Sequence, residues 1–229
     1  MIRALTSAAS GMLAQSLKQD IIANNIANAQ TPGFKRGKLV TESFAQALEN
    51  KITDKENDSK KPDYPNSPVK CMITRAQSVQ DMSQGSLRNT GNHLDFAIEG
   101  PGDFEIATAN GTRLTRAGNF QINAQGELCT VDGEKVQGQS GSIKVDKADW
   151  NVTDDGTILS NGQPVDKIKI VGAQSETHVL QGSIEEANFN VVREMVDMIS
   201  NLRSFEANQK VITFADHTLD KLINEAGRV

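Results

Sequence analysis

The two ends of this sequence are helical over lengths that a small globular core cannot cover. Residues 188–226 contain neither proline nor glycine and read as one continuous helix, which at 1.5 Å per residue is about 58 Å long. Residues 2–29 read as a second helix, which Pro32-Gly33 ends. Helices of this kind gain most of their stability from packing. The chain is therefore restricted to folds in which its terminal helices pair with each other or with another chain.

The apolar residues of the C-terminal helix follow two registers. With a spacing of three and four residues, the first register contains Val192, Met195, Ile199 and Leu202, and the second contains Ile212, Ala215, Leu219, Leu222 and Ala226. The second is displaced by one residue, which is about 100° of rotation. We expect the two halves to face different partners, one of them the N-terminal helix and the other another subunit. A single kinked, imperfectly amphipathic helix is the alternative.

The N-terminal helix has a broad apolar face that is rich in alanine. This face contains Leu5, Ala9, Met12 and Ile26. Small side chains bury little area each, so the helix is expected to be weak alone. It needs neighbours on more than one side, and we expect the listed side chains of both helices to form the assembly interface.

The middle of the chain differs from its ends in its proline and glycine residues, which mark a linker and a series of turns. Residues 50–70 contain three prolines and no periodicity, which predicts an exposed linker or arm. From about 71 to 182, X-Gly pairs recur between short β-prone runs and predict tight hairpin turns; they are Asn110-Gly111, Gln125-Gly126, Asp132-Gly133, Asp155-Gly156 and Asn161-Gly162. This region is expected to be an all-β domain of antiparallel strands.

The predicted fold class is therefore α+β. Long N- and C-terminal α-helices pair as a coiled-coil-like inner domain, and a central all-β antiparallel domain lies between them in sequence. The expected domains are residues 1–35 with 184–229, which form the helical polymerising part, and residues 36–183, which form the β domain and include the arm 50–70.

Composition excludes several classes of function. The net charge of -5 gives no reason to expect nucleic-acid binding. Cys71 and Cys129 are too few for a disulfide framework or a zinc site. No apolar run is long enough to span a membrane, and polar residues interrupt the start where a signal peptide needs an apolar stretch. With only 4% aromatic residues, one large core is hard to build from this chain.

No arrangement of residues predicts catalysis or a cofactor. His93, His178 and His217 lie far apart and match no zinc or triad motif. Asp154-Asp155 is read as a hairpin turn and Glu185-Glu186 as a helix start, not as a glycosidase pair. We therefore expect no enzyme, no metal and no cofactor, but a structural or interaction protein.

Motifs at both ends and in the middle of the chain resemble those of a known protein family. The N-terminal runs are A-A-S-G-M from Ala8, N-N-I-A-N from Asn24 and T-P-G-F-K-R from Thr31; the C-terminal helix contains F-E-A-N from Phe205 and K-V-I from Lys210; and T-R-A-G-N-F from Thr115 lies in the middle. Over nearly the whole chain, this pattern resembles the bacterial flagellar rod and hook proteins.

The resemblance implies a structural subunit of the flagellar basal-body rod, which self-assembles through its terminal helices into the axial drive shaft for motility. Its implied partners are itself, other rod and hook proteins, the flagellar type III export apparatus and ring proteins around the rod. It implies export without a cleaved signal peptide to the periplasm-spanning rod. The short chain favours a proximal rod subunit; a distal rod subunit and a secreted helical-stalk adhesin are the alternatives.

The resemblance also implies a hinge between the inner helix and the outer domain. The hinge residues are Asn25, Asn28, Thr31, Gly33, Phe34 and Lys35. Asn25 and Asn28 are expected to satisfy terminal backbone groups, Gly33 to adopt a conformation closed to other residues, and Phe34 to act as a hydrophobic pin.

Overall fold

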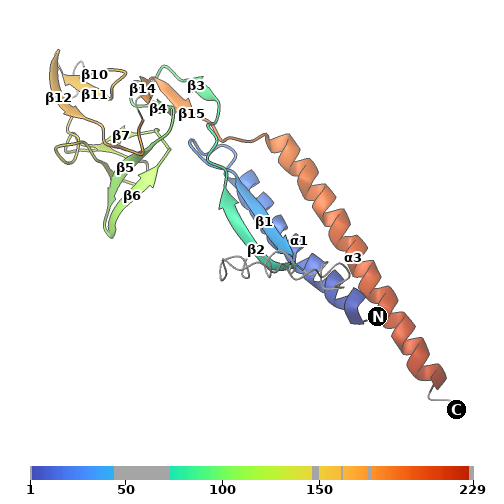
Figure 1. The fold of residues 1–229 in the computed structure, drawn as a ribbon. Helices are drawn as coiled ribbons and strands as arrows, with labels where there is room; N and C mark the ends of the chain where they lie inside the picture. Colours follow the sequence, from blue (N-terminus) through green and yellow to red (C-terminus); the bar gives the residue numbers. More distant parts are fainter. Residues whose placement is uncertain (1, 44–72, 146–149, 161, 175–176, 227–229) are drawn as a thin grey trace, which may run out of the picture. The chain divides into compact units, whose positions relative to one another are not determined.

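The computed structural model describes residues 2–43, 73–145, 150–160, 162–174 and 177–226. Its two helices are α1 (Ile2–Ala27) and α3 (Val191–Ala226) (Figure 1). The strands are β1 (Gly37–Ser43), β2 (Ile73–Gln80), β3 (Leu87–Asn89), β4 (Phe96–Glu99), β5 (Asp103–Thr108), β6 (Gly111–Thr115), β7 (Gln121–Ile122), β8 (Leu128–Cys129), β9 (Lys135–Val136), β10 (Trp150–Val152), β11 (Thr157–Ser160), β12 (Gln163–Lys167), β13 (Ile170–Val171), β14 (His178–Gln181) and β15 (Ser183–Glu185). Both predicted helices and the β-rich middle are confirmed. The expected arm 50–70 and Cys71 lie outside the described residues.

The described residues form two compact units. The helical unit takes its residues from 1–27, 37–81 and 190–229, and the β unit takes them from 28–36 and 82–189. This division differs from the expected domains in three places. Residues 184–189 group with the strands, because β15 pairs with β3. The β1–β2 ribbon groups with the helices, because the Asn25 side chain bonds both backbone groups of Gly37. Residues 28–36 group with the strands, because the Gly33 N–H donates to the Glu185 carbonyl at 2.7 Å.

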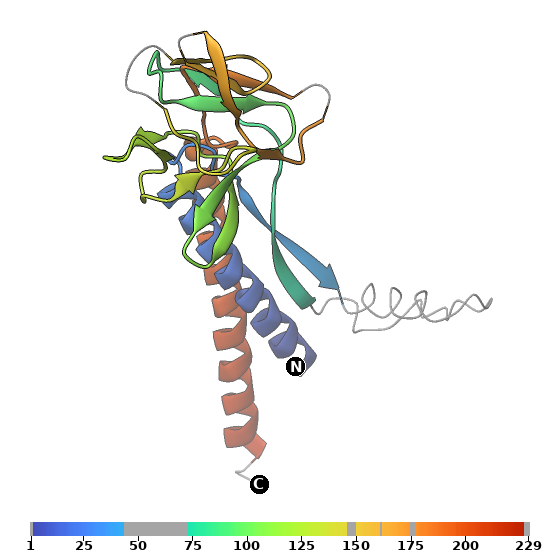
Figure 2. The same cartoon turned by 90° about the vertical axis from the view of Figure 1, so that its left-hand side faces the viewer.

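Within the helical unit, α1 and α3 run side by side and antiparallel (Figures 1 and 2). The antiparallel β1–β2 ribbon packs against α1, with Lys38 opposite Val79 and Val40 opposite Gln77. At the start of the ribbon, Gly37 faces Ile21 and Asn25 of α1, since a Cβ atom at Gly37 would lie 3.2 Å from Ile21 Cγ2. The helix α1 is thus covered on two sides, by α3 and by the ribbon.

The β unit consists of antiparallel sheets around one core. Six strands form the largest sheet in the order β13-β5-β9-β8-β7, with β6 paired to β5; β10-β11-β12 form a second sheet, and β14-β4 and β15-β3 form pairs. Four of the five predicted X-Gly turns are confirmed, for example Asn110-Gly111 between β5 and β6, where Gly111 has φ 131°. In the fifth, Asn161-Gly162, Asn161 lies outside the described residues. The core contains Phe96, Ile98, Phe104, Ile106, Phe120, Leu128, Val136, Ile143, Val145, Ile158, Ile168 and Val179.

Four of the ten aromatic residues lie in or against this core. Phe120 lies between Phe96 and Phe104, with ring centroids 5.9 and 5.3 Å apart, and Trp150 lies 5.9 Å from Phe96. Aromatic side chains bury large areas. The β unit can therefore close its own core, while the helices must find their stability elsewhere.

Candidate functional site

The interface between α1 and α3 is polar at its centre. The buried Asn201 side chain donates to the Gln15 backbone carbonyl at 2.8 Å and to Gln19 Oε1 at 3.0 Å. About two helical turns further along α3, Asn208 Nδ2 donates to Gln15 Oε1 at 3.1 Å. Polar side chains at seam positions fix the register of paired helices at some cost in stability. These contacts set how far α3 is shifted along α1.

A second polar contact joins α1, α3 and β1. The Asn25 amide donates to Glu194 Oε2 at 3.2 Å and to the Gly37 carbonyl at 3.0 Å, and its Oδ1 accepts from the Gly37 N–H at 2.9 Å. Asn25 and Glu194 are both 1% exposed. Asn25 therefore satisfies the backbone where β1 begins, rather than the end of its own helix.

The first apolar register of α3 points away from α1. The side chains of Val192, Met195, Ile199 and Leu202, together with Val196, are between 45% and 69% exposed. The positions that face α1 follow another row, which is Glu194, Met198, Asn201, Phe205, Asn208 and Ile212. This exposed stripe on α3, Val192 to Leu202, thus has no cover within the described part of the chain.

The second register lies on the side that faces α1. Ile212 is half-buried in the row that faces α1, and Leu219 and Leu222 continue that row at 37% and 51% exposure. The apolar residues of the two halves therefore lie on different sides of α3. Those of the second half, not those of the first, lie in the row that faces α1, and the partners expected for the two registers remain a prediction.

The expected apolar face of α1 is only partly buried. Leu5, Met12 and Ile26 are half-buried, but Ala9 is exposed. The buried residues of α1 are Ala8, Ala14, Ile22 and Asn25. The face of α1 that packs on α3 differs from the apolar face, because polar Gln15, Gln19 and Asn25 lie in the interface. The role of Leu5, Ala9, Met12 and Ile26 in assembly remains a prediction.

Asn201 offers a direct test of the polar interface. Asn201→Ala removes a buried donor with two partners, and we expect the helix pair to lose about 1–3 kcal/mol of local stability. The measurement is hydrogen exchange of the α1 backbone amides, which should become faster. The control is Asn224→Ala, the same change at an exposed position of α3. Equal exchange in both variants would contradict a register-fixing role for Asn201.

The predicted hinge centres on a buried carboxylate that the sequence analysis did not assign to the hinge. Glu185 is 1% exposed; its Oε1 accepts from Lys35 Nζ at 2.7 Å and from the Gly85 N–H at 2.8 Å, and its Oε2 accepts from Arg116 Nε at 2.6 Å. The expectation that Glu185-Glu186 starts a helix is wrong. Glu185 ends strand β15, and α3 begins only at Val191.

The pKa of the Glu185 carboxyl reflects this arrangement. Burial by itself would raise the pKa, but the hydrogen bonds from Lys35, Gly85 and Arg116 outweigh it. The pKa is lowered below its ordinary value of 4.5. Glu185 therefore carries its negative charge between two cations at neutral pH.

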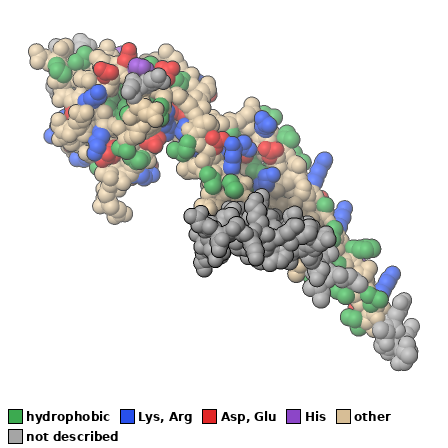
Figure 3. Space-filling model, in the orientation of Figure 1, with side chains coloured by type: hydrophobic (Ala, Val, Ile, Leu, Met, Phe, Trp, Pro, Cys, Tyr) green, Lys and Arg blue, Asp and Glu red, His purple; other side chains and the backbone are tan. Residues whose placement is uncertain are grey.

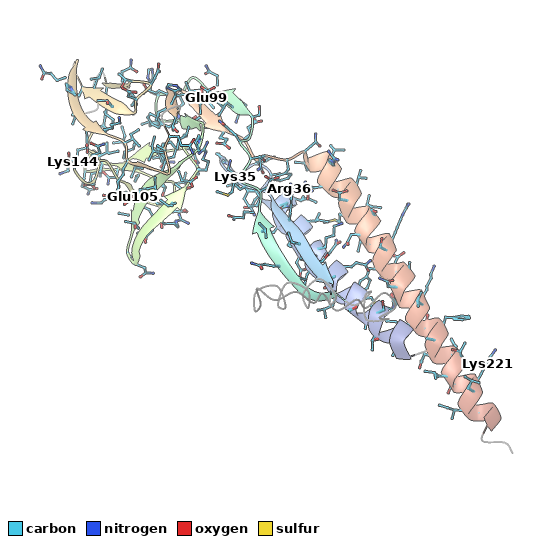
Figure 4. All side chains as sticks on the ribbon, in the orientation of Figure 1. Lys35, Arg36, Glu99, Glu105, Lys144 and Lys221 are labelled. Atoms are coloured by element: carbon cyan, nitrogen blue, oxygen red, sulfur yellow. The ribbon has the colours of Figure 1, made fainter. Side chains whose placement is uncertain are left out.

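Arg116 ties this cluster to the backbone of the β unit. Its Nη2 atom donates to the Ile98 carbonyl at 2.9 Å and to the Gly100 carbonyl at 2.6 Å, and Nη1 donates to the Gly102 carbonyl. The Lys35 ammonium also donates to the Ser83 carbonyl at 2.9 Å. Figure 4 labels Lys35 and Arg36 on the segment that leads into β1. A hydrogen-bonded ion cluster thus holds residues 28–36 onto the β unit.

The other expected hinge residues have varied surroundings. Gly33 has φ 69°, and its backbone lies against Arg116 and Ala117. Phe34 is half-buried and meets Phe189 edge-to-face, with ring centroids 6.1 Å apart. Thr31 is exposed; its N–H donates to the Asn28 carbonyl at 3.1 Å, which forms a turn after α1.

A pocket of about 310 Å³ opens beside the hinge cluster. It is lined by Lys35, Met82, Gln84, Gly100, Pro101, Gly102, Asp103 and Arg116. Asp103 is its single carboxylate, whereas glycoside hydrolysis takes a facing pair. Among the described residues no group of three or more His, Cys, Asp or Glu side chains is placed to hold a metal ion. No helix of the described chain is long and apolar enough to cross a membrane.

Three family models match separate parts of the chain. Residues 5–35 match the flagella basal body rod protein model, residues 97–163 match the flagellar hook protein FlgE/F/G D1 domain, and residues 180–225 match the flagellar basal body rod FlgEFG protein C-terminal model. The matches at 5–35 and 180–225 contain most of the α1–α3 interface and all six hinge residues.

Curated relatives extend over almost the full length. The flagellar basal-body rod protein FlgG of Agrobacterium fabrum is 32% identical over 94% of this chain and 96% of its own. FlgG of Buchnera aphidicola subsp. Baizongia pistaciae is 31% identical over 97% of this chain and 99% of its own. The rod protein FlgF of Escherichia coli is 29% identical over 91% of this chain and 92% of its own. The chain therefore belongs to the flagellar basal-body rod protein family and is a structural subunit of the flagellar rod.

Proposed function

We propose that this rod subunit polymerises through the outward faces of its terminal helices, which associate as a coiled-coil-like inner domain. The observation that carries the proposal is the exposed stripe on α3, Val192 to Leu202, which has five apolar side chains at 45–69% exposure. On α1, Leu13 and Leu17 are also exposed, at 69% and 39%. Apolar faces of this extent on a soluble subunit typically mark an interaction surface.

The energy available from this stripe is sufficient for assembly. Fully burying a Val, Leu, Ile or Met side chain contributes about 1.5–3 kcal/mol. Since the five side chains are roughly half exposed, their complete burial offers roughly 5 kcal/mol per subunit before the entropy lost on association. Repeated along a polymer with several neighbours, such contacts stabilise the assembly without requiring a stable dimer.

The polar interface within the subunit complements this arrangement. A helix pair with Asn and Gln at its centre is specific in register but weak, while its apolar residues remain outside for neighbours. We infer that the terminal helices gain their full order only in the assembled rod. Weak terminal helices also suit passage through the type III export apparatus in an unfolded state, without a cleaved signal peptide.

The proposed partners are further copies of this chain, other rod and hook proteins, and ring proteins around the rod. Relatives named FlgG and FlgF match similar shares of the chain. We keep the proximal position as our proposal, because only a short segment separates β13 from β15 and the β unit is small. Site-specific photocrosslinking from the β unit in isolated basal bodies would identify the neighbouring rod protein.

We also propose that the subunit has no catalytic activity. The family is structural, and the pocket beside the hinge has one carboxylate among its lining residues. Its cations Lys35 and Arg116 are engaged by Glu185. This arrangement favours a mechanical role for the cluster.

The central test changes one residue of the exposed stripe. Ile199→Asp places a charge where burial against a neighbour is proposed, and an unpaired charge in such a contact costs several kcal/mol. We expect the isolated subunit to keep its unfolding transition, because Ile199 is 53% exposed. We expect the variant to be missing from isolated basal bodies and swimming to be lost in a strain that lacks the wild-type gene.

The matched control is Ser200→Asp, which adds the same charge to the adjacent exposed residue. Ser200 lies about 100° further round the helix than Ile199. The Ser200→Asp variant should assemble into rods and support swimming at near wild-type levels. Normal rods built from the Ile199→Asp chain would contradict the proposed role of the stripe.

A further inference from the structure

The helix α3 is longer than its partner α1, and the offset is fixed by their contacts. Gly11 of α1 faces Asn208, since a Cβ atom at Gly11 would lie 3.2 Å from Asn208 Nδ2. Because the helices are antiparallel, α1 reaches its first residue, Ile2, opposite roughly residue 217. The last turns of α3, from about 218 to Ala226, therefore extend beyond α1.

This overhang carries the most apolar part of the row that faces α1. Within the pair, polar Glu194, Asn201 and Asn208 alternate in this row with apolar Met198, Phe205 and Ile212. Beyond the start of α1 it continues as Leu219 and Leu222, with Ile223 beside them, and these side chains are 37%, 51% and 68% exposed. The row thus loses its polar members where α1 no longer covers it, which is the reverse of what solubility alone would favour.

We propose that the overhang of α3, Leu219 to Ile223, docks on the exposed stripe Val192 to Leu202 of a second copy of this chain. This inference rests on the proposed function and deepens it by assigning which two surfaces meet. The overhang continues an existing helix-packing row, so a further helix can extend it in the same geometry. The exposed stripe lies on a different side of α3 and towards its other end. One copy can therefore use both surfaces at once.

The charges beside the two surfaces are partly complementary. Arg193 and Arg203 are exposed beside the stripe, while Asp216 and Asp220 are exposed beside the overhang, which also carries the exposed Lys221. Such rim charges contribute little energy but favour one partner and one orientation. Figure 3 shows hydrophobic side chains along the exposed side of α3 down to its C-terminal turns, and Figure 4 labels Lys221 on the overhang.

A contact between two different surfaces has a consequence for assembly. When each copy offers both surfaces, the contact is heterologous and repeats without closing unless the rotation happens to form a ring. An open-ended axial structure follows directly. A contact of the overhang with another overhang would instead be symmetric and would stop at a dimer.

The test is disulfide cross-linking in assembled basal bodies, in a chain whose Cys71 and Cys129 are replaced by serine. Ile199→Cys and Leu222→Cys lie about 35 Å apart on one helix, so a disulfide between them joins two copies. The chain carrying both cysteines is expected to give a ladder of covalent multimers on a non-reducing gel. Each single-cysteine chain is expected to remain monomeric.

The matched control pairs Leu222→Cys with Ser200→Cys, which turns the second thiol by about 100°, and it should give no ladder. Dimers from the Leu222→Cys chain alone, or no ladder from the double variant in normally assembled rods, would overturn the inference. Failure of the Ile199→Asp test would remove the proposed function itself. If Ile199→Asp blocks assembly but no 199–222 ladder forms, only the pairing of surfaces is wrong.

Discussion

Gly33→Ala is expected to lower the free energy of unfolding of the β unit by about 3 kcal/mol or more. Two independent costs add at this position. Gly33 has φ 69°, and left-handed backbone costs an L-residue with a side chain about 1–2 kcal/mol. In addition, a Cβ atom would lie 2.4 Å from the Arg116 carbonyl carbon and 2.6 Å from the Ala117 nitrogen. Backbone cannot swing away as the end of a flexible side chain can.

Gly91→Ala separates the two costs. Gly91 has φ 70°, almost the same as Gly33, but a Cβ atom there meets nothing within 4 Å. It should lose only the conformational part, about 1 kcal/mol. The measurement is urea unfolding followed by the fluorescence of Trp150, which packs beside the core at Phe96. If both alanine variants unfold at the same urea concentration, the close approach of Gly33 to Arg116 is not a tight constraint.

The conformation at Gly33 and the hairpin turns could be predicted because they depend on local rules. A glycine after proline at a helix end, or after Asn or Asp between β-prone runs, requires only that the backbone turn there. The same holds for the two helices, whose lengths follow from the absence of Gly and Pro in residues 188–226. Local signals of this kind need no knowledge of distant residues.

The faces of the helices were harder to predict, because they depend on which partner covers them. Apolar spacing indicated Val192, Met195, Ile199 and Leu202 as an interface, but the described chain buries the row of Asn201 and Glu194 instead. A polar side chain is buried only where another group can hydrogen-bond to it, as Gln15 and Gln19 do with Asn201. That complementarity joins residues more than 180 positions apart, so no periodicity within one helix reveals it.

Glu185 and Arg116 illustrate the same limit more strongly. Both lie within runs that have simple local readings, and adjacent Glu186 is exposed in a pair with Arg88. Only the folded chain brings Lys35, Arg116 and Glu185 together, from segments 69 and 150 positions apart. The useful signal was Arg116 itself, in a T-R-A-G-N-F run whose resemblance to the rod and hook proteins pointed to this segment without giving its role.

Glu185→Gln is expected to destabilise the β unit at neutral pH by about 3–5 kcal/mol, because it leaves two cations without their counter-charge in a buried site. The glutamine side chain has nearly the same shape, so packing changes little. Its amide group, however, brings a donor towards the donors of Lys35 or Arg116. The matched control is Glu186→Gln, whose side chain is 46% exposed and pairs with Arg88 at 2.8 Å. Surface pairs contribute about 0–1 kcal/mol, so this variant should unfold close to wild type.

The pH dependence distinguishes lost charge from lost packing. The pKa of Glu185 is lower in the folded protein than its ordinary value of 4.5, so the unfolded chain binds the proton more readily. The stability that the carboxylate contributes is therefore complete above that ordinary value and is lost as the pH falls through the lower folded value. Wild type should lose stability more steeply than Glu185→Gln as the pH falls below about 4.5, and the two urea midpoints should converge. Parallel curves for the two proteins would mean that Glu185 acts through its shape rather than its charge, and the ion cluster would then not be what holds residues 28–36 in place.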